Sequence, residues 1–254
     1  MKLFDLSGKT AIVTGGGKGV GRQLAEGLAE AGANLVLCAR QADRCELAAA
    51  ELEQLGVRAL GLGCDVRDPE QVQEVVARTV ADFGRVDILV NNAGTVWGAT
   101  PEDTPLEGWQ KVVDVNLTGV FLFSQAAGRR MIEDGGGTIV NIASVAGLRS
   151  GPPEVMNAIA YNATKGGVIA FTRDLAGKWA HHGIRVNAIA PGWFPSDMAN
   201  FVLDQHGDDI KRRIPLGRFG GPDDLKGAVI FLASEASAYV TAQTLVVDGG
   251  QSAW

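Results

Sequence analysis

Short runs rich in β-branched residues alternate along this chain with longer stretches of helical period. Several of the short runs are continuously apolar, as expected for strands of a parallel sheet that helices cover on both faces. We therefore predict an α/β fold built on a doubly wound parallel sheet of about seven strands. The predicted strands are residues 10–13, 34–38, 57–64, 86–90, 138–142, 185–189 and 244–247. The predicted helices are residues 22–31, 42–55, 69–83, 109–132, 163–179 and 223–233.

Composition and charge narrow the class of protein further. Of the 254 residues, 46% are hydrophobic, which is ample for a large core, and no linker interrupts the series, so residues 1–254 are predicted to form one domain. The net charge of −6 argues against nucleic acid as the main partner, because binding phosphates requires clustered lysine and arginine. No uncharged apolar stretch is long enough to span a bilayer, and the N-terminus lacks the apolar core of a secretory signal. We therefore expect no membrane partner and a cytoplasmic location.

The three cysteines do not indicate a metal site or a disulfide framework. Their number is odd, and Cys38, Cys45 and Cys64 lack the spacing of metal ligands. We therefore predict no bound metal.

A glycine-rich turn connects the first predicted strand to the first predicted helix. Its glycines allow a tight turn and a close backbone approach to a pyrophosphate, and the helix N-terminus offers free N–H groups to the same anion. Glycine-rich turns also occur for purely steric reasons, but a strand before this one and a helix after it favour a dinucleotide site of Rossmann type. The residues assigned to this site are Gly15, Gly17, Lys18, Gly19, Val20 and Gly21.

The end of the second predicted strand bears on which dinucleotide would bind. An acidic residue at that point accepts hydrogen bonds from the ribose 2′-hydroxyl, whereas an arginine accommodates a 2′-phosphate. Here the strand continues into Ala39 and Arg40. Arg40 and Lys18 can form a cationic clamp for the additional phosphate, although both also fit the pattern of solvated surface charges. NADP is therefore favoured over NAD.

A tyrosine and a lysine lie four residues apart in the predicted helix near residue 163, and so share one helix face. Tyrosine loses its proton near pH 10, so Tyr161 is a poor base at neutral pH unless a neighbouring cation stabilises the phenolate. Lys165 can supply that charge. The spacing alone is common in helices, and its meaning depends on the other motifs of the chain.

Several short motifs occur in one order along residues 6–250, and their combination resembles the short-chain dehydrogenase/reductase family. They are the glycine-rich turn, Asn91-Asn92-Ala93-Gly94 after a strand, Asn116 in a helix, Ser144 at a strand end, Tyr161 with Lys165, and Pro191-Gly192 after another strand. The resemblance implies an NADP-dependent oxidoreductase that acts on a CH–OH group.

The resemblance also implies a role for each matching residue. Tyr161 corresponds to the catalytic acid/base, Ser144 to the hydroxyl that polarises the carbonyl, and Lys165 to the residue that binds the nicotinamide ribose and lowers the tyrosine pKa. Asn116 corresponds to the asparagine that holds a water in the proton relay. The implied cofactor contacts, besides the glycine-rich turn, Arg40, Tyr161 and Lys165, are Asp65, Val66, Asn92, Ala93, Gly94, Pro191, Gly192, Phe194 and Ser196.

The substrate-side loops, at about residues 145–160 and 193–220, bear on specificity. The first is longer than is usual in the family, and together the loops most resemble those of gluconate 5-dehydrogenases, which implies a small polar substrate such as a sugar acid or polyol. We expect Arg149 to pair with a substrate carboxylate or to be a solvated loop residue.

The main alternative substrate is a 3-oxoacyl group on a carrier protein. Carrier proteins are strongly acidic, so their reductases need basic residues near the active-site mouth, which we expect at the C-terminal ends of the two long helices. Those ends read Glu133-Asp134-Gly135 and His181-His182-Gly183, which disfavours an acidic partner.

Two other interpretations of the sequence differ in class. One is a non-catalytic NADP-binding regulator, which would have no physical need for the complete proton path. The other is a sugar-nucleotide epimerase or dehydratase, for whose larger C-terminal region the chain has no room.

The family resemblance further implies a homotetramer. Small and apolar residues on the two long predicted helices look exposed and suited to close packing between subunits. They are Ala126, Ala127, Gly128, Phe171 and Trp179.

Overall fold

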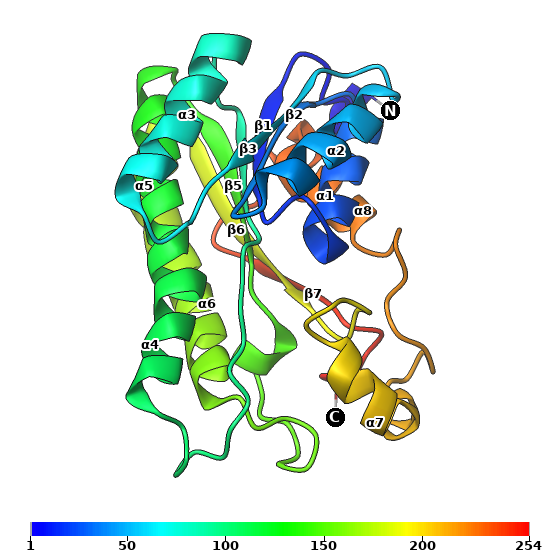
Figure 1. Cartoon of the computed structure of the whole chain (residues 1–254). Helices are drawn as coiled ribbons and strands as arrows, with labels where there is room; N and C mark the ends of the chain where they lie inside the picture. The colour runs from blue at the N-terminus through cyan, green and yellow to red at the C-terminus, as the bar shows by residue number, and fades with distance from the viewer. Residues whose placement is uncertain (1, 254) are drawn as a thin grey trace.

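All seven predicted strands pair in one parallel sheet in the computed structural model, which describes residues 2–253 (Figure 1). Met1 and Trp254, the two ends of the predicted domain, lie outside the described residues. The strand order β3-β2-β1-β4-β5-β6-β7 confirms the predicted fold class. The strands are β1 (Thr10–Thr14), β2 (Asn34–Ala39), β3 (Ala59–Gly63), β4 (Ile88–Asn91), β5 (Gly137–Ile142), β6 (Ile184–Pro191) and β7 (Thr244–Val247).

Helices cover both faces of the sheet (Figure 1). One face carries α1 (Gly19–Glu30), α2 (Ala42–Glu53) and α8 (Lys226–Ala233). The other carries α3 (Pro69–Phe83), α5 (Gly119–Glu133) and α6 (Ile159–Trp179). Two further helices, α4 (Leu106–Val113) and α7 (Asn200–Arg212), extend toward the end of the molecule where the strands terminate.

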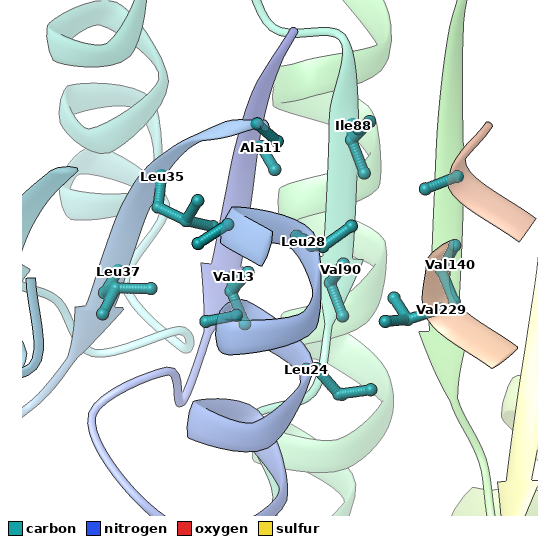
Figure 2. Close-up of a cluster of buried hydrophobic side chains, with 14 of the residues drawn as sticks. Ala11, Val13, Leu24, Leu28, Leu35, Leu37, Ile88, Val90, Val140 and Val229 are labelled. Atoms are coloured by element: carbon teal, nitrogen blue, oxygen red, sulfur yellow. The ribbon is translucent and has the colours of Figure 1, made fainter. Parts of the chain in front are cut away.

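Neighbouring residues of the central strands pack into two different hydrophobic cores, one on each face of the sheet. Successive side chains of a strand point to opposite faces, so Val13 packs with α1 while Ile12 packs with α3 and α5. Figure 2 shows the first of these cores, in which Leu24 and Leu28 of α1 lie over the strands. Burial on both faces explains why these strands read as continuous apolar runs.

Local signals place α3 where the sequence predicts it. The carboxylate of Asp68 accepts hydrogen bonds from the backbone N–H groups of Glu70 and Gln71, at 2.9 and 3.3 Å. Pro69 occupies the first turn, and Gly84 ends the helix with a φ of 90°.

Several predicted helices differ from the structure. Helix α1 begins at Gly19 rather than at residue 22, and α6 begins at Ile159 rather than at residue 163. The helix predicted over 109–132 begins at Leu106, and a π-helical turn at Asp114–Thr118 divides it into α4 and α5. Helix α7 lies inside the segment 193–220 that was predicted as loop, although its partly buried Val202, Leu203 and His206 and its buried Ile210 recur at helical spacing. Helix α8 begins at Lys226 rather than at residue 223.

Two residues predicted to be exposed for subunit packing are buried within the chain. Ala127 is fully buried. A Cβ on Gly128 would lie 2.3 Å from the ring of Trp179, which therefore covers this glycine. Ala126, Phe171 and Trp179 are partly exposed.

The C-terminal ends of the two long helices also lie elsewhere than predicted. Helix α5 ends at Glu133 just before β5 begins, and the turn at Gly183 just precedes β6. Both ends therefore lie at the amino edge of the parallel sheet, opposite the edge that carries Ser144. The acidic character of the α5 end therefore has no bearing on the active-site mouth.

The carboxyl edge of the sheet is where this topology places ligands. The chain passes from β3 to β4 on the other side of β1, so the strand order reverses between β1 and β4. Crevices at such reversals bind ligands in open α/β sheets. Within residues 2–253, no helix is both long and apolar enough to cross a membrane.

Candidate active site

The glycine-rich turn leaves the first turn of α1 open to an anion. Helix α1 begins at Gly19, and its N-cap residue Lys18 is extended and forms no side-chain cap. A Cβ on Gly21 would lie 2.2 Å from the carbonyl oxygen of Gly15, so this position admits no side chain. Gly19 has a φ of 53°, and the nearest atom to a Cβ there would be that of Ser196 at 3.7 Å. Unsatisfied N–H groups behind this cradle fit a pyrophosphate.

The other glycine-turn residues support the cradle from behind. A Cβ on Gly17 would lie 3.3 Å from the Sγ of Cys45, so this glycine packs against α2. Val20 is half-buried against the core that contains α1.

Hydrogen bonds clamp the ends of β1 and β4 together at the strand-order reversal. The Oγ1 of Thr14 accepts bonds from the backbone N–H groups of Asn92 and Ala93, both at 2.9 Å. The amide of Asn92 donates to the carbonyl oxygens of Thr14 and Gly15, at 2.9 and 3.3 Å. Sequence reasoning assigned Asn92 but missed Thr14, whose only signal is a hydroxyl at the end of an apolar strand. Both residues hold the glycine-rich turn in place.

The predicted adenosine end of the site carries several charges. The carboxylate of Asp65 accepts bonds from Arg67 Nε at 3.0 Å and Nη2 at 2.6 Å. The hydrogen bonds to Arg67 lower the pKa of Asp65, and the more distant charge of Arg40 acts in the same direction. Arg40 is exposed, whereas Val66 is buried and would contact a Cβ on Gly119 at 2.8 Å.

Lys165 is a buried cation beside the tyrosine. Its Nζ donates to the carbonyl oxygen of Ile142 at 2.6 Å and lies 5.6 Å from the ring centroid of Tyr161. Burial lowers the pKa of Lys165 from 10.5 to about 8. The chain thus places an ammonium group under the tyrosine ring, as predicted from their spacing.

Ser144 and Tyr161 come together from strand β5 and helix α6. The Oγ of Ser144, just beyond β5, accepts a bond from the backbone N–H of Ala146 at 3.1 Å. Tyr161 keeps part of its surface accessible, yet burial raises its pKa, while its hydrogen bond with Ser144 acts in the opposite direction. The phenol is therefore protonated at neutral pH and can donate a proton to an oxygen bound beside Ser144.

Asn116 joins the loop after β4 to helix α6. Its Oδ1 accepts a bond from the Thr95 N–H at 2.8 Å, and its Nδ2 donates to the Thr95 carbonyl at 2.9 Å and to Thr164 Oγ1 at 3.3 Å. Asn116 lies in the π turn, a feature that often marks functional sites. A Cβ on Gly94 would lie 3.6 Å from its Oδ1. The asparagine thus positions the residue that precedes Lys165.

The segment after β6 packs tightly against the end of β7. The N–H of Gly192 donates to the carbonyl of Val247 at 3.0 Å, and a Cβ on Gly192 would lie 2.8 Å from that of Asp248. Pro191 ends β6 and is buried. Phe194 was predicted to contact the cofactor, but its side chain is buried in the core, where a Cβ on Gly220 would lie 2.2 Å from the ring. The predicted contact between Phe194 and the cofactor stays a prediction.

Two cations of the predicted site have protein partners. Lys18 Nζ lies 2.5 Å from the carboxylate of Asp197, a residue that sequence reasoning missed. Ser196, next to it, accepts a bond from the Ala199 N–H at 3.3 Å. The guanidinium of Arg149 donates to the backbone carbonyl of Gln251, which ties the first substrate-side loop to the C-terminal segment.

Comparison with known proteins identifies the family of this chain. Residues 15–252 match the family described as enoyl-(acyl carrier protein) reductase. The chain is 40% identical to a D-threitol dehydrogenase of Mycolicibacterium smegmatis, covering 97% of this chain and 94% of that one. It is 38% identical to a 3-oxoacyl-[acyl-carrier-protein] reductase of Synechocystis, covering 98% of each. A crystal structure of a gluconate 5-dehydrogenase from Burkholderia cenocepacia, in complex with NADP and tartrate, superimposes with a TM-score of 0.94 at 39% identity, covering 100% and 98% of the two chains.

The chain belongs to the short-chain dehydrogenase/reductase family. Members of this family are oxidoreductases that use a nicotinamide dinucleotide. The uncapped first turn of α1, the glycine cradle and the cations near it fit such a cofactor. Among residues 2–253 of this short-chain dehydrogenase/reductase, no group of histidine, cysteine and acidic side chains could hold a metal ion.

Proposed function

We propose that this chain interconverts a secondary alcohol and a ketone, with Tyr161 moving the proton. The observation that carries the proposal is the convergence of Tyr161, Ser144 and Lys165 at the carboxyl edge of the sheet. A nicotinamide cofactor, when bound, supplies or accepts the hydride.

The side chains of Ser144, Tyr161 and Lys165 would stabilise the charge on the substrate oxygen and transfer the proton. Reduction of a carbonyl builds negative charge on its oxygen, and the hydroxyls of Ser144 and Tyr161 donate hydrogen bonds to that oxygen. Tyr161 then transfers its proton. The charge of Lys165, held 5.6 Å from the ring centroid, favours the phenolate that remains. In the oxidative direction the same phenolate accepts the proton of the alcohol.

We also propose that NADP(H) is the preferred cofactor. Strand β2 ends at Ala39, which cannot accept hydrogen bonds from a ribose 2′-hydroxyl through its side chain. Arg40 follows it and is exposed, so its guanidinium is available to a 2′-phosphate. Lys18, from the glycine-rich turn, is the second cation assigned to that phosphate.

The substrate we propose is a sugar acid or related polyol. The similarity of the chain to a threitol dehydrogenase and to a gluconate 5-dehydrogenase supports this class. The similarly high identity to a 3-oxoacyl-[acyl-carrier-protein] reductase makes a ketoreductase of that type the alternative.

The assembly and the cellular location complete the proposal. We propose a homotetramer, because Phe121 on α5 is 46% exposed, and Leu245 and Val246 on the edge strand β7 are 36% and 37% exposed. A cytoplasmic location accords with three buried cysteines that form no disulfide within the described residues. We also propose that residues 1–254 form a single domain.

A panel of substrates tests the proposed reaction. Initial rates with NADP(H) and NAD(H) are measured on 5-ketogluconate, related keto-sugar acids, polyols and 3-oxoacyl thioesters. The proposal expects the highest kcat/KM among the sugar acids and polyols. A far higher kcat/KM for 3-oxoacyl thioesters would instead establish the alternative, and tight NADPH binding without turnover of any substrate would indicate a regulator.

A further inference from the structure

Lys18 and Asp197 form an ion pair between segments that are 179 residues apart in the sequence. Lys18 belongs to the glycine-rich turn, and Asp197 follows the segment that leaves β6. A Cβ built on Gly19 would lie 3.7 Å from the Cβ of Ser196, so the two segments also lie close together at this point. The pair therefore lies beside the cradle to which the pyrophosphate is assigned.

The surroundings of Asp197 are cationic. Its hydrogen bond to Lys18, followed by the charge of Lys18, lowers the pKa of Asp197, and the charge of Arg44 acts in the same direction. The backbone of Arg44 lies 3.3 Å from a Cβ built on Gly17. Asp197 is thus a carboxylate that lies close to Lys18, with the charge of Arg44 also acting on it.

We infer that Asp197 tunes cofactor selectivity by competing with the 2′-phosphate of NADP for Lys18; this inference rests on the proposed function. An ammonium is a single compact charge, so a carboxylate at 2.5 Å neutralises much of what Lys18 offers to another anion. A 2′-phosphate that binds Lys18 must either displace Asp197 or share the charge with it. NAD lacks this phosphate and therefore avoids this competition.

The substitution Asp197→Asn tests the inference because it removes the charge and keeps the shape. Both partners are more than half exposed, so the expected effect is that of a surface ion pair. Isothermal titration with NADP+ and NAD+ should show NADP+ binding about two- to five-fold tighter, and a higher ratio of the NAD+ to the NADP+ Kd. The gain should shrink when salt is raised from about 0.05 to 0.5 M.

Asp174→Asn is the matched control. It removes the carboxylate of another surface ion pair, Asp174 with Lys178 at 2.6 Å, whose side chains are similarly exposed. This pair lies on α6, 13 residues beyond Tyr161 or about 20 Å along the helix. The control should leave both Kd values unchanged. In a Lys18→Met background, Asp197→Asn should no longer alter the ratio, because the shared cation is gone.

The outcomes separate this inference from the proposed function. If wild type prefers NADP+ but Asp197→Asn leaves the ratio unchanged, the inference alone is wrong. If Asp197→Asn weakens both dinucleotides equally, the pair fastens the two segments over the cofactor and the competition is refuted. A wild type that binds neither dinucleotide would overturn the proposed function together with the inference.

Discussion

Replacing Lys165 with methionine should make the free energy of unfolding depend less on pH. Burial lowers the pKa of Lys165 from 10.5 to about 8, so the unfolded chain binds its proton more tightly than the folded chain does. Burying the protonated Lys165 therefore lowers the free energy of unfolding. This destabilisation is fully present below pH 8 and is relieved as pH rises from 8 toward 10.5. At about 1.36 kcal/mol per pKa unit, it amounts to about 3 kcal/mol at pH 7, of which about 2 kcal/mol is lost by pH 9.5.

Urea unfolding at a fixed protein concentration measures this effect. The unfolding free energy of wild type, relative to Lys165→Met, should rise by about 2 kcal/mol between pH 7 and pH 9.5. The sign at one pH is less informative, because the variant also leaves the Ile142 carbonyl without the bond it accepts at 2.6 Å. The change with pH isolates the proton.

Lys178→Met provides the baseline, because Lys178 occupies the exposed face of the same helix. Its pH trend relative to wild type is subtracted from that of Lys165→Met. A corrected difference that stays flat between pH 7 and pH 9.5 would refute the reasoning, since Lys165 could not then be a desolvated ammonium in the folded chain. A difference that falls as pH rises would mean that folding raises the pKa of Lys165, the opposite of what burial predicts.

Two further predictions follow from the charges and the surface. Arg40→Asp should lower the kcat/KM ratio of NADP(H) to NAD(H) by about ten-fold or more, because it exchanges a phosphate partner for a carboxylate that repels phosphate; an unchanged ratio measured with both cofactors would dismiss Arg40 as a determinant. Light scattering at micromolar concentration should give a tetramer, in which the exposed Phe121, Leu245 and Val246 are covered; a monomeric mass would exclude this assembly.

The order of elements was predictable because each central strand is buried on both faces and each adjacent helix on one. Two helical features of the structure were not predicted. Helix α7 carries a helical signal, because Val202, Leu203, His206 and Ile210 share one face, but that face is mostly half-buried and was not distinguished from a loop. The π turn at Asn116 widens a single turn between α4 and α5, which is too short a change to stand out in the sequence pattern.

Contacts between residues far apart in the sequence are the part of the site that could not be predicted. The roles of Tyr161, Lys165 and Ser144 were predicted from the resemblance of several ordered motifs to a known family, and the helical spacing alone predicted only that Tyr161 and Lys165 share one face. The partnership of Lys18 with Asp197 has no local signal, because 179 residues separate the two. Gly128 looked exposed because the ring that covers it belongs to Trp179 on another helix.

The central claim is that Tyr161 transfers the proton. Substituting Tyr161→Phe removes the hydroxyl and keeps the ring volume, so the Kd of the dinucleotide should remain close to that of wild type. General acid–base catalysis contributes about 10²- to 10⁴-fold, so kcat should fall by about that factor on the best substrate. A variant that retains more than about a tenth of the wild-type kcat, a loss of under about 1.4 kcal/mol in the barrier, would contradict the account.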